Sequence, residues 1–137
     1  KATAKLGFKY DSFSEDSRLK EQNIGDFAGM KYIELERLTK KLDVYSPNWL
    51  MDERFVPPKG ESFINLNDKV KQFLNEKILE KNQGNVVIFS HGGPIRSAIN
   101  IALGNQEVKV GPFKIENLKV TKISYNHKIW QIDFVNS

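Results

Sequence analysis

Two segments of the chain carry hydrophobic side chains at steps of three and four, the spacing of an amphipathic helix. In residues 31–42 the repeating positions are Tyr32, Leu35, Leu38 and Leu42. In residues 61–81 the larger apolar side chains fall on one predicted face, at Phe63, Leu66, Val70, Phe73, Leu74 and Ile78. Glu61, in the predicted first turn of the second helix, suits the positive end of the helix dipole. Residues 43–60 contain Pro47, Pro57 and Pro58 and predict an irregular connection.

The apolar pattern changes after these helices. Residues 85–90, NVVIFS, form a short apolar run that is typical of a β-strand buried on both faces. Residues 94–103 predict a further helix, with Pro94 at its first position and Gly104 just past its end.

The last part of the chain is rich in β-branched and aromatic residues. Residues 115–125 and 128–135 predict the two strands of a β-hairpin joined at Asn126-His127. Helices that alternate with a buried strand and are followed by a hairpin indicate an α/β domain with a mixed sheet. The length of 137 residues fits a single domain, residues 1–137.

Composition excludes several classes of protein. No apolar run approaches the roughly 20 residues of a membrane-spanning helix, and residues 1–10 lack the apolar region of a signal peptide. The absence of cysteine excludes disulfides, thiolate metal sites and a cysteine nucleophile. The net charge is +4, but the lysines are dispersed, which favours a solvated surface over a nucleic-acid interface. We expect a cytoplasmic protein.

The segment SHGG, which follows the predicted strand 85–90, is the first candidate site. Ligands of open α/β sheets bind beyond the carboxyl ends of the strands, which is where His91 is placed. Gly92 and Gly93 let a ligand approach the backbone, and the helix that begins at Pro94 directs free N–H groups to the same place. An imidazole beside a helix N-terminus suits a phosphate or another oxyanion. The alternative is that His91 is a packed or solvent-facing residue of an ordinary strand-to-helix turn.

Residues 16–29, DSRLKEQNIGDFAG, are the second candidate. They predict a loop that carries Arg18, Glu21 and Asn23, and loops hold a large share of catalytic groups. The alternative is that Arg18 and Glu21 are surface charges.

Residues 57–62, PPKGES, are the third candidate. Glu61 and Ser62 most simply start and cap the long helix, and a ligand role is the weaker interpretation. His127 is expected to be exposed at the tip of the hairpin. Two distant histidines and no cysteine give no metal-ligand cluster.

In this order the three segments resemble the histidine phosphatase superfamily, whose members share the phosphoglycerate mutase-like fold. The resemblance rests on Arg18-Leu19-Lys20-Glu21 with Gly25 and Gly29, on Pro58-Lys59-Gly60-Glu61-Ser62, and on Ser90-His91-Gly92-Gly93-Pro94-Ile95-Arg96. It extends to the closing hairpin and covers nearly the whole chain. It implies a three-layer α/β fold with a mixed, mostly parallel sheet.

The sequence departs from the family pattern in three places. Phe27-Ala28 replace a more usual Trp-Glu pair, and Lys69 stands where arginine is usual. The third departure is larger, because the family's Arg-His-Gly, which carries the nucleophilic histidine and lies on the central strand, does not occur. We therefore expect the 137 residues to lack that strand, and the nucleophile and both pocket arginines to lie outside this chain. The chain alone is expected to be inactive.

The resemblance implies a phosphomonoester hydrolase that works through a phosphohistidine. It places Glu21 and His91 among the catalytic residues, Glu21 as general acid and base and His91 as the second histidine. It places Gly92, Arg18 and Asn23 among the substrate-binding residues. Arg96 is expected to be structural. No metal or organic cofactor is implied, and the expected partner is a small phosphorylated metabolite, with no nucleic acid, no membrane and a possible homodimer.

The compact spacing between Glu21 and Gly60 resembles the small phosphatases, especially the α-ribazole phosphatase group. Two alternatives stay open. One is a phosphate-binding fragment or pseudo-phosphatase without turnover, and the other is a mutase-type phosphotransferase.

Overall fold

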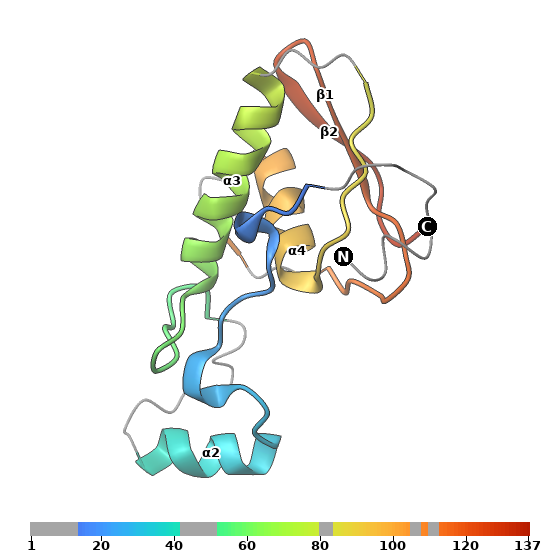
Figure 1. Ribbon diagram of the computed structural model, residues 1–137. Helices are drawn as coiled ribbons and strands as arrows, with labels where there is room; N and C mark the ends of the chain where they lie inside the picture. The colour runs from blue at the N-terminus through green and yellow to red at the C-terminus, as the bar shows by residue number, and fades with distance from the viewer. Residues whose placement is uncertain (1–13, 42–51, 80–83, 105–107, 110–112) are drawn as a thin grey trace.

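The fold was obtained as a computed structural model, which describes residues 14–41, 52–79, 84–104, 108–109 and 113–137 (Figure 1). Its helices are α2 (Tyr32–Lys41), α3 (Phe63–Leu79) and α4 (Gly92–Ala102), and its strands are β1 (Lys122–Asn126) and β2 (Ile129–Phe134). Two short 3-10 helices, Ser17–Leu19 and Gly25–Phe27, precede α2. Figure 1 shows α3 and α4 side by side, with the hairpin next to α4 and α2 at the far end. Among the described residues, no helix is both long and apolar enough to cross a membrane.

The main core lies along one face of α3. The buried residues of that face are Phe63, Leu66, Val70, Phe73 and Leu74. They pack against partly buried side chains of α4 and of the hairpin, among them Ala98, Ile101, Ile123 and Trp130. Between the two helices, the buried Ser97 hydroxyl donates to Asn67 Oδ1 at 2.9 Å. The amphipathic helix predicted over this segment is therefore confirmed, and its apolar face holds α4 in place.

The start of α3 follows from its first residues. Ser62 Oγ accepts from the Asn65 N–H at 3.1 Å, while Asn65 Oδ1 accepts from the Ser62 N–H at 3.1 Å. This reciprocal pair satisfies backbone N–H groups that a helix leaves without partners at its first turn. The predicted capping role of Ser62 is confirmed, whereas Glu61 lies just before the helix and not in its first turn.

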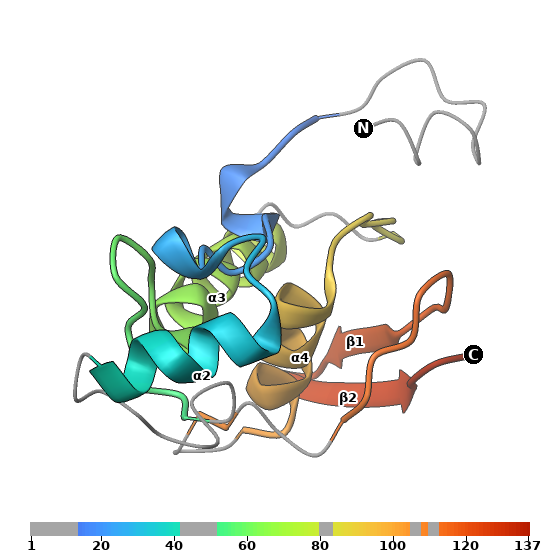
Figure 2. The ribbon, with the colours of Figure 1, turned by 90° about the horizontal axis from the view of Figure 1, so that it is seen from below.

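A second, smaller core lies at the α2 end of the molecule, which Figure 2 shows from below. Phe27 and Leu35 are buried there, with Ile24, Leu38 and Phe55 packed against them. The rings of Phe27 and Phe55 are stacked with their centroids 6.1 Å apart. The predicted helix 31–42 is thus present as α2, while Leu42 lies outside the described residues.

Helix α4 begins two residues earlier than the sequence indicated. Gly92 is its first residue and His91 its N-cap, so that Pro94 lies inside the first turn and not at its start. A proline is tolerated there because the first N–H groups of a helix have no partner within the helix. Gly104 follows the helix with a φ of +65°, as expected for a terminating glycine.

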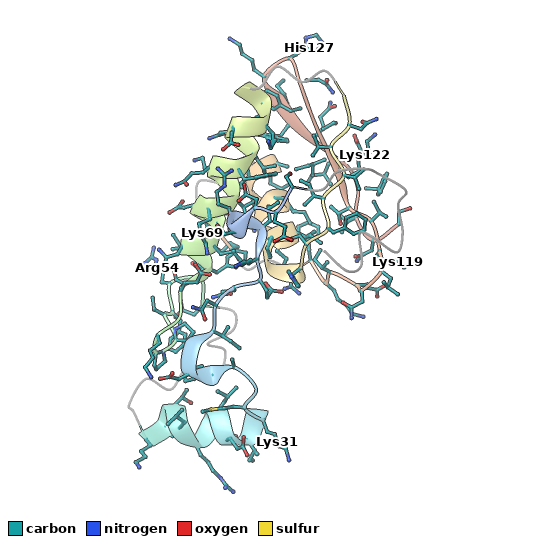
Figure 3. The ribbon with its side chains drawn as sticks, viewed as in Figure 1. Lys31, Arg54, Lys69, Lys119, Lys122 and His127 are labelled. Carbon is teal, nitrogen blue, oxygen red and sulfur yellow. The ribbon has the colours of Figure 1, made fainter. Side chains whose placement is uncertain are left out.

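The terminal hairpin is confirmed, with a turn one residue later than predicted. Strands β1 and β2 pair antiparallel and Asn126 pairs with Ile129, so the two turn residues are His127 and Lys128. Both have positive φ values, 50° and 65°, which is the geometry of a type I′ turn. His127 is exposed at this tip, as expected (Figure 3).

The strand predicted at residues 85–90 is not formed. The segment pairs with no strand, and Val86, Val87, Ile88 and Phe89 are 55%, 59%, 41% and 41% exposed. In Figure 1 it is the yellow tube that leads into α4. The described residues contain one sheet of two antiparallel strands, and the predicted mixed, mostly parallel sheet is not confirmed. An apolar strand needs neighbouring strands for its backbone groups, and no described segment supplies them.

Candidate functional site

The carboxylate of Glu21 lies at the N-terminus of α4. The Gly93 N–H donates to Glu21 Oε1 at 3.1 Å and to Oε2 at 3.4 Å. The Gln22 N–H donates to the same Oε1 at 2.9 Å, which fixes the carboxylate from its own loop. An anion is favourable at this position because the first N–H groups of a helix carry a partial positive charge. Glu21 and the His91-Gly92-Gly93 segment, separate candidates in the sequence, thus form one site.

Gly93 is a glycine because Glu21 approaches it closely. A Cβ atom at position 93 would overlap Glu21 Oε1 and would lie 3.0 Å from Leu66 Cδ2. The Gly92 N–H donates to no described acceptor and remains available at the same end of the helix. The site therefore combines a carboxylate, a free backbone N–H and the positive end of a helix.

His91 is placed at this site by the backbone that precedes α4. Its φ of −122° and ψ of 173° are extended, and its imidazole makes no capping hydrogen bond. The side chain is exposed, so its ring nitrogens are available to a ligand. The Ser90 hydroxyl just before it donates to the Leu19 carbonyl at 2.7 Å, which ties the entry to α4 to the loop that carries Glu21.

Arg96 has the structural contact expected of it. Its Nε donates to the Phe113 carbonyl at 2.9 Å, which holds the segment before the hairpin against α4. Its Nη1 lies 3.5 Å from the position that a Cβ of Gly92 would occupy, so the guanidinium flanks the start of the helix.

The loop that follows Glu21, residues 22–26, packs against the loop that precedes α3, residues 57–61, and the two are called the interlocked loops. The Asp26 N–H donates to the Pro58 carbonyl at 2.9 Å, and the Glu61 N–H donates to the Asn23 carbonyl at 2.8 Å. Gly25 has a φ of +54°, and a Cβ there would overlap the backbone of residues 58–60. A Cβ at Gly60 would in turn lie 2.6 Å from the Asn23 carbonyl oxygen. Gly25 and Gly60 are thus required by this close approach.

Glu61 links these loops to α3. Its Oε1 accepts from the Asn23 N–H at 3.0 Å, and its Oε2 lies 2.6 Å from Lys69 Nζ. The backbone carbonyl of Glu61 accepts from Gln22 Nε2 at 2.9 Å. Lys69 projects from α3 (Figure 3). Sequence reasoning placed Glu61 at the helix start and missed its contacts with residues 22 and 23, because they join positions 38 and 39 residues apart.

Asn23, expected among the substrate-binding residues, is engaged within the interlocked loops. Its Oδ1 accepts from the Gly25 N–H at 2.9 Å, and its Nδ2 donates to the Lys59 carbonyl at 3.4 Å. Its side chain therefore shapes the loop.

Arg18, also expected to bind substrate, faces α3. Its guanidinium forms ion pairs with Asp16 at 2.6 Å and with Glu76 at 2.8 Å, and it lies over the Phe73 ring. Hydrogen bonds from Arg18 lower the pKa values of both carboxylates, and the same contacts raise the pKa of Arg18. With two carboxylates already bound, Arg18 anchors the loop on α3.

The chemistry that this arrangement supports is the binding of an oxyanion. The backbone N–H of Gly92 and the imidazole of His91 are donors for phosphoryl oxygens, and Glu21 is placed to exchange a proton with a group bound beside them. No cluster of three or more His, Asp or Glu side chains suited to a metal ion occurs in the described part of the chain.

Comparison with known proteins identifies the family of this chain and several of its relatives. Residues 2–137 match the histidine phosphatase superfamily (branch 1). A glucosyl-3-phosphoglycerate phosphatase of Mycolicibacterium vanbaalenii is 28% identical over 98 residues, 66% of this chain and 42% of that protein.

Solved structures show the same fold. The α-ribazole phosphatase from Shigella flexneri superposes with a TM-score of 0.76 at 20% identity, over 89% of this chain and 59% of that one. A mycobacterial glucosyl-3-phosphoglycerate phosphatase in complex with inorganic phosphate gives a TM-score of 0.72 at 22% identity, over 89% of this chain and 63% of that one. The chain thus spans less than two thirds of the length of these relatives. Its sequence match over residues 2–137 makes the chain a member of the histidine phosphatase superfamily.

Proposed function

We propose that these residues form the acid–base half of a phosphomonoester hydrolase whose nucleophilic histidine lies outside the 137 residues. The observation that carries the proposal is the position of the Glu21 carboxylate at the N-terminus of α4, the helix whose N-cap is His91. Family membership and the phosphatases among the relatives support the reaction class.

In the proposed reaction a histidine nitrogen attacks phosphorus, and the bond from phosphorus to the ester oxygen breaks. Glu21, as the carboxylic acid, gives its proton to the departing oxygen. His91 and the Gly92 N–H stabilise charge on the phosphoryl oxygens. In the second half-reaction the Glu21 carboxylate takes a proton from water, the water oxygen attacks phosphorus, and the phosphorus–nitrogen bond breaks. Inorganic phosphate leaves and the protonation state of Glu21 is restored.

The proposed substrate is a small phosphorylated metabolite. The relatives named for glucosyl-3-phosphoglycerate and α-ribazole support a phosphatase that acts on a phosphorylated sugar or nucleoside-like compound. An α-ribazole phosphatase-like activity is the preferred form. The protein is proposed to be cytoplasmic.

Hydrolysis of an aryl phosphate by the protein encoded by the complete reading frame tests this proposal. We expect His91→Ala and Glu21→Gln to lower kcat by about 100-fold or more, the range of lost acid–base or oxyanion catalysis. His127→Ala is the matched control, because His127 is exposed at the hairpin tip, and it is expected to retain full activity. Unchanged turnover in His91→Ala would contradict the proposal.

The isolated 137-residue chain separates the alternatives. It is expected to show no turnover. A complete reading frame without an Arg-His-Gly, combined with phosphate binding and no hydrolysis, would favour a phosphate-binding pseudo-phosphatase. Transfer of the phosphoryl group to a second hydroxyl compound faster than to water would favour a mutase-type phosphotransferase.

A further inference from the structure

We infer that Glu61 is a positioning residue that holds Glu21 at the N-terminus of α4, acting through the backbone of Asn23 and anchored by Lys69. The inference builds on the proposed role of Glu21 and gives a function to the Gly60-Glu61-Ser62 segment that the proposed reaction leaves unused. The contacts of Glu61 are with Gln22, Asn23 and Lys69, so its effect on the site is indirect.

The contacts of Glu61 converge on the two residues that follow Glu21. Its Oε1 and its N–H bind the Asn23 N–H and carbonyl at 3.0 Å and 2.8 Å, and its carbonyl accepts from Gln22 Nε2 at 2.9 Å. The Asn23 backbone is thus bound at both its N–H and its carbonyl. A displacement of Asn23 moves Glu21, because only one residue separates them.

The other carboxylate oxygen of Glu61 is held by α3. Lys69 Nζ lies 2.6 Å from Oε2, and the Glu61 side chain is only 17% exposed, which strengthens a charged contact. Helix α3 also packs against α4, the helix whose N-terminus receives Glu21. Lys69 and Glu61 therefore connect the Glu21 loop to the packed pair of helices α3 and α4, and His91 is the N-cap of α4.

A capping or packing role alone does not account for this arrangement. Ser62 and Asn65 already cap α3 without Glu61. The interlocked loops are held together independently by the Asp26 N–H to Pro58 bond and by the Lys59–Asp26 ion pair at 3.1 Å. The carboxylate of Glu61 adds a connection to residues 22 and 23, next to Glu21.

Amide hydrogen exchange of Gly93 measures the placement of Glu21 without any need for turnover. In the protein encoded by the complete reading frame, Glu21→Ala removes the acceptor of the Gly93 N–H and sets the exchange rate of the unprotected amide. We expect Glu61→Ala to raise the Gly93 rate about tenfold toward that value, as expected for a local opening that global stability does not control. Glu61→Gln keeps an oxygen that accepts from Asn23 and is expected to change the rate less than about threefold.

Two references separate positioning from general destabilisation. The Leu103 N–H, bonded to the Ile99 carbonyl at the other end of α4, reports the stability of the helix and is expected to keep its rate. Asp26→Asn removes the Lys59 ion pair from the same loops and is the matched control, with Gly93 unchanged. If Glu61→Ala does not fold, Glu61→Met takes its place, because it keeps the length of the side chain, removes both carboxylate oxygens and leaves every backbone bond of the loops in place.

A Gly93 rate that stays unchanged in Glu61→Ala, or that rises only together with the Leu103 rate, would overturn the inference. In the complete protein, Glu61→Ala is expected to lower kcat about 10- to 100-fold with little change in KM, the effect of a misplaced catalytic group, and Glu61→Gln to restore most of it. A positive exchange result with no turnover in any variant would contradict the proposed function and leave the positioning role intact.

Discussion

The Glu21 carboxylate accepts a hydrogen bond from the Gly93 N–H, although the two residues lie 72 positions apart in the sequence. This contact brings the carboxylate of one loop to the helix N-terminus that follows His91. Among the described residues it is the point at which the candidate general acid and the candidate phosphate site meet.

Gly93→Ala is expected to displace Glu21 and leave the fold intact. The new Cβ would overlap Glu21 Oε1, the far end of a flexible side chain, so the carboxylate moves and the backbone does not. Hydrolysis by the complete protein is expected to fall about 100-fold, as for loss of a general acid, with the thermal midpoint nearly unchanged. Gly84→Ala is the control, because nothing lies within 4 Å of its Cβ position. Full activity in Gly93→Ala would show that Glu21 does not need this position.

The sequence was informative about which residues form the site, and less so about what each one does. The strand-Gly-Gly-helix turn at His91 and Gly92 is visible in a few adjacent residues, whereas the roles expected for Glu21, Arg18 and Asn23 came from the family resemblance. The contacts of Arg18 and Asn23 with distant residues could not be predicted. Glu76, one turn before the end of α3, forms an ion pair with Arg18. The Lys59 carbonyl, in the facing loop, accepts from Asn23 Nδ2. Such tertiary contacts leave no periodic signal in one sequence.

Gly25→Ala is expected to destabilise the protein more than Gly29→Ala. Both glycines have positive φ values, +54° and +78°, and an alanine in that region costs about 1–2 kcal/mol. Gly29 has open space at its Cβ position, whereas Gly25 faces the rigid backbone of residues 58–60. Urea unfolding of the two variants measures the difference. Equal losses would mean that the two loops separate at little cost.

Arg18→Met is expected to lower stability at neutral pH and to have little effect in acid. Hydrogen bonds from Arg18 lower the pKa values of Asp16 and Glu76 below their ordinary values of 3.8 and 4.5. The stabilisation is complete above those ordinary values and is lost as pH falls through the lowered values of the folded state. Arg18 itself stays protonated throughout, because its pKa is raised.

Unfolding by urea at pH 7 and at an acid pH below the lowered pKa values measures this linkage, since both carboxylates are protonated there. Arg37→Met, an exposed arginine on α2, is the control and is expected to change stability little at either pH. A loss in Arg18→Met that is the same at both pH values would assign the role of Arg18 to its contact with the Phe73 ring instead.

The fold was predictable where each element buries its own apolar face within the chain. Helix α3, its cap at Ser62 and the hairpin were all found from local patterns, with errors of one or two residues at turns and helix starts. The strand predicted at residues 85–90 was wrong for a different reason. The run NVVIFS has the composition of a doubly covered strand, but a strand also depends on neighbours that its own sequence does not specify.

The exposed 85–90 segment predicts association of the 137-residue chain. Val86 and Val87 are 55% and 59% exposed on a backbone segment that joins no sheet, a combination that favours pairing with another chain. Val87→Lys is expected to suppress concentration-dependent association measured by light scattering. Val56→Lys, at a valine of 55% exposure outside this segment, is expected to leave it unchanged. A wild-type chain that remains monomeric as its concentration rises would contradict this prediction.

The wide sequence separation of the Glu21 contacts has a consequence for folding order. Glu21 meets Gly93 across 72 residues, Leu19 meets Ser90 across 71, and Asn23 meets Glu61 across 38. Because loop closure opposes such distant contacts, the α3–α4 pair and the hairpin are expected to form in the folding transition state before them. Substitutions at the loop junction would then accelerate unfolding and barely slow folding. The candidate site would be the last part of the molecule to assemble and the first to open.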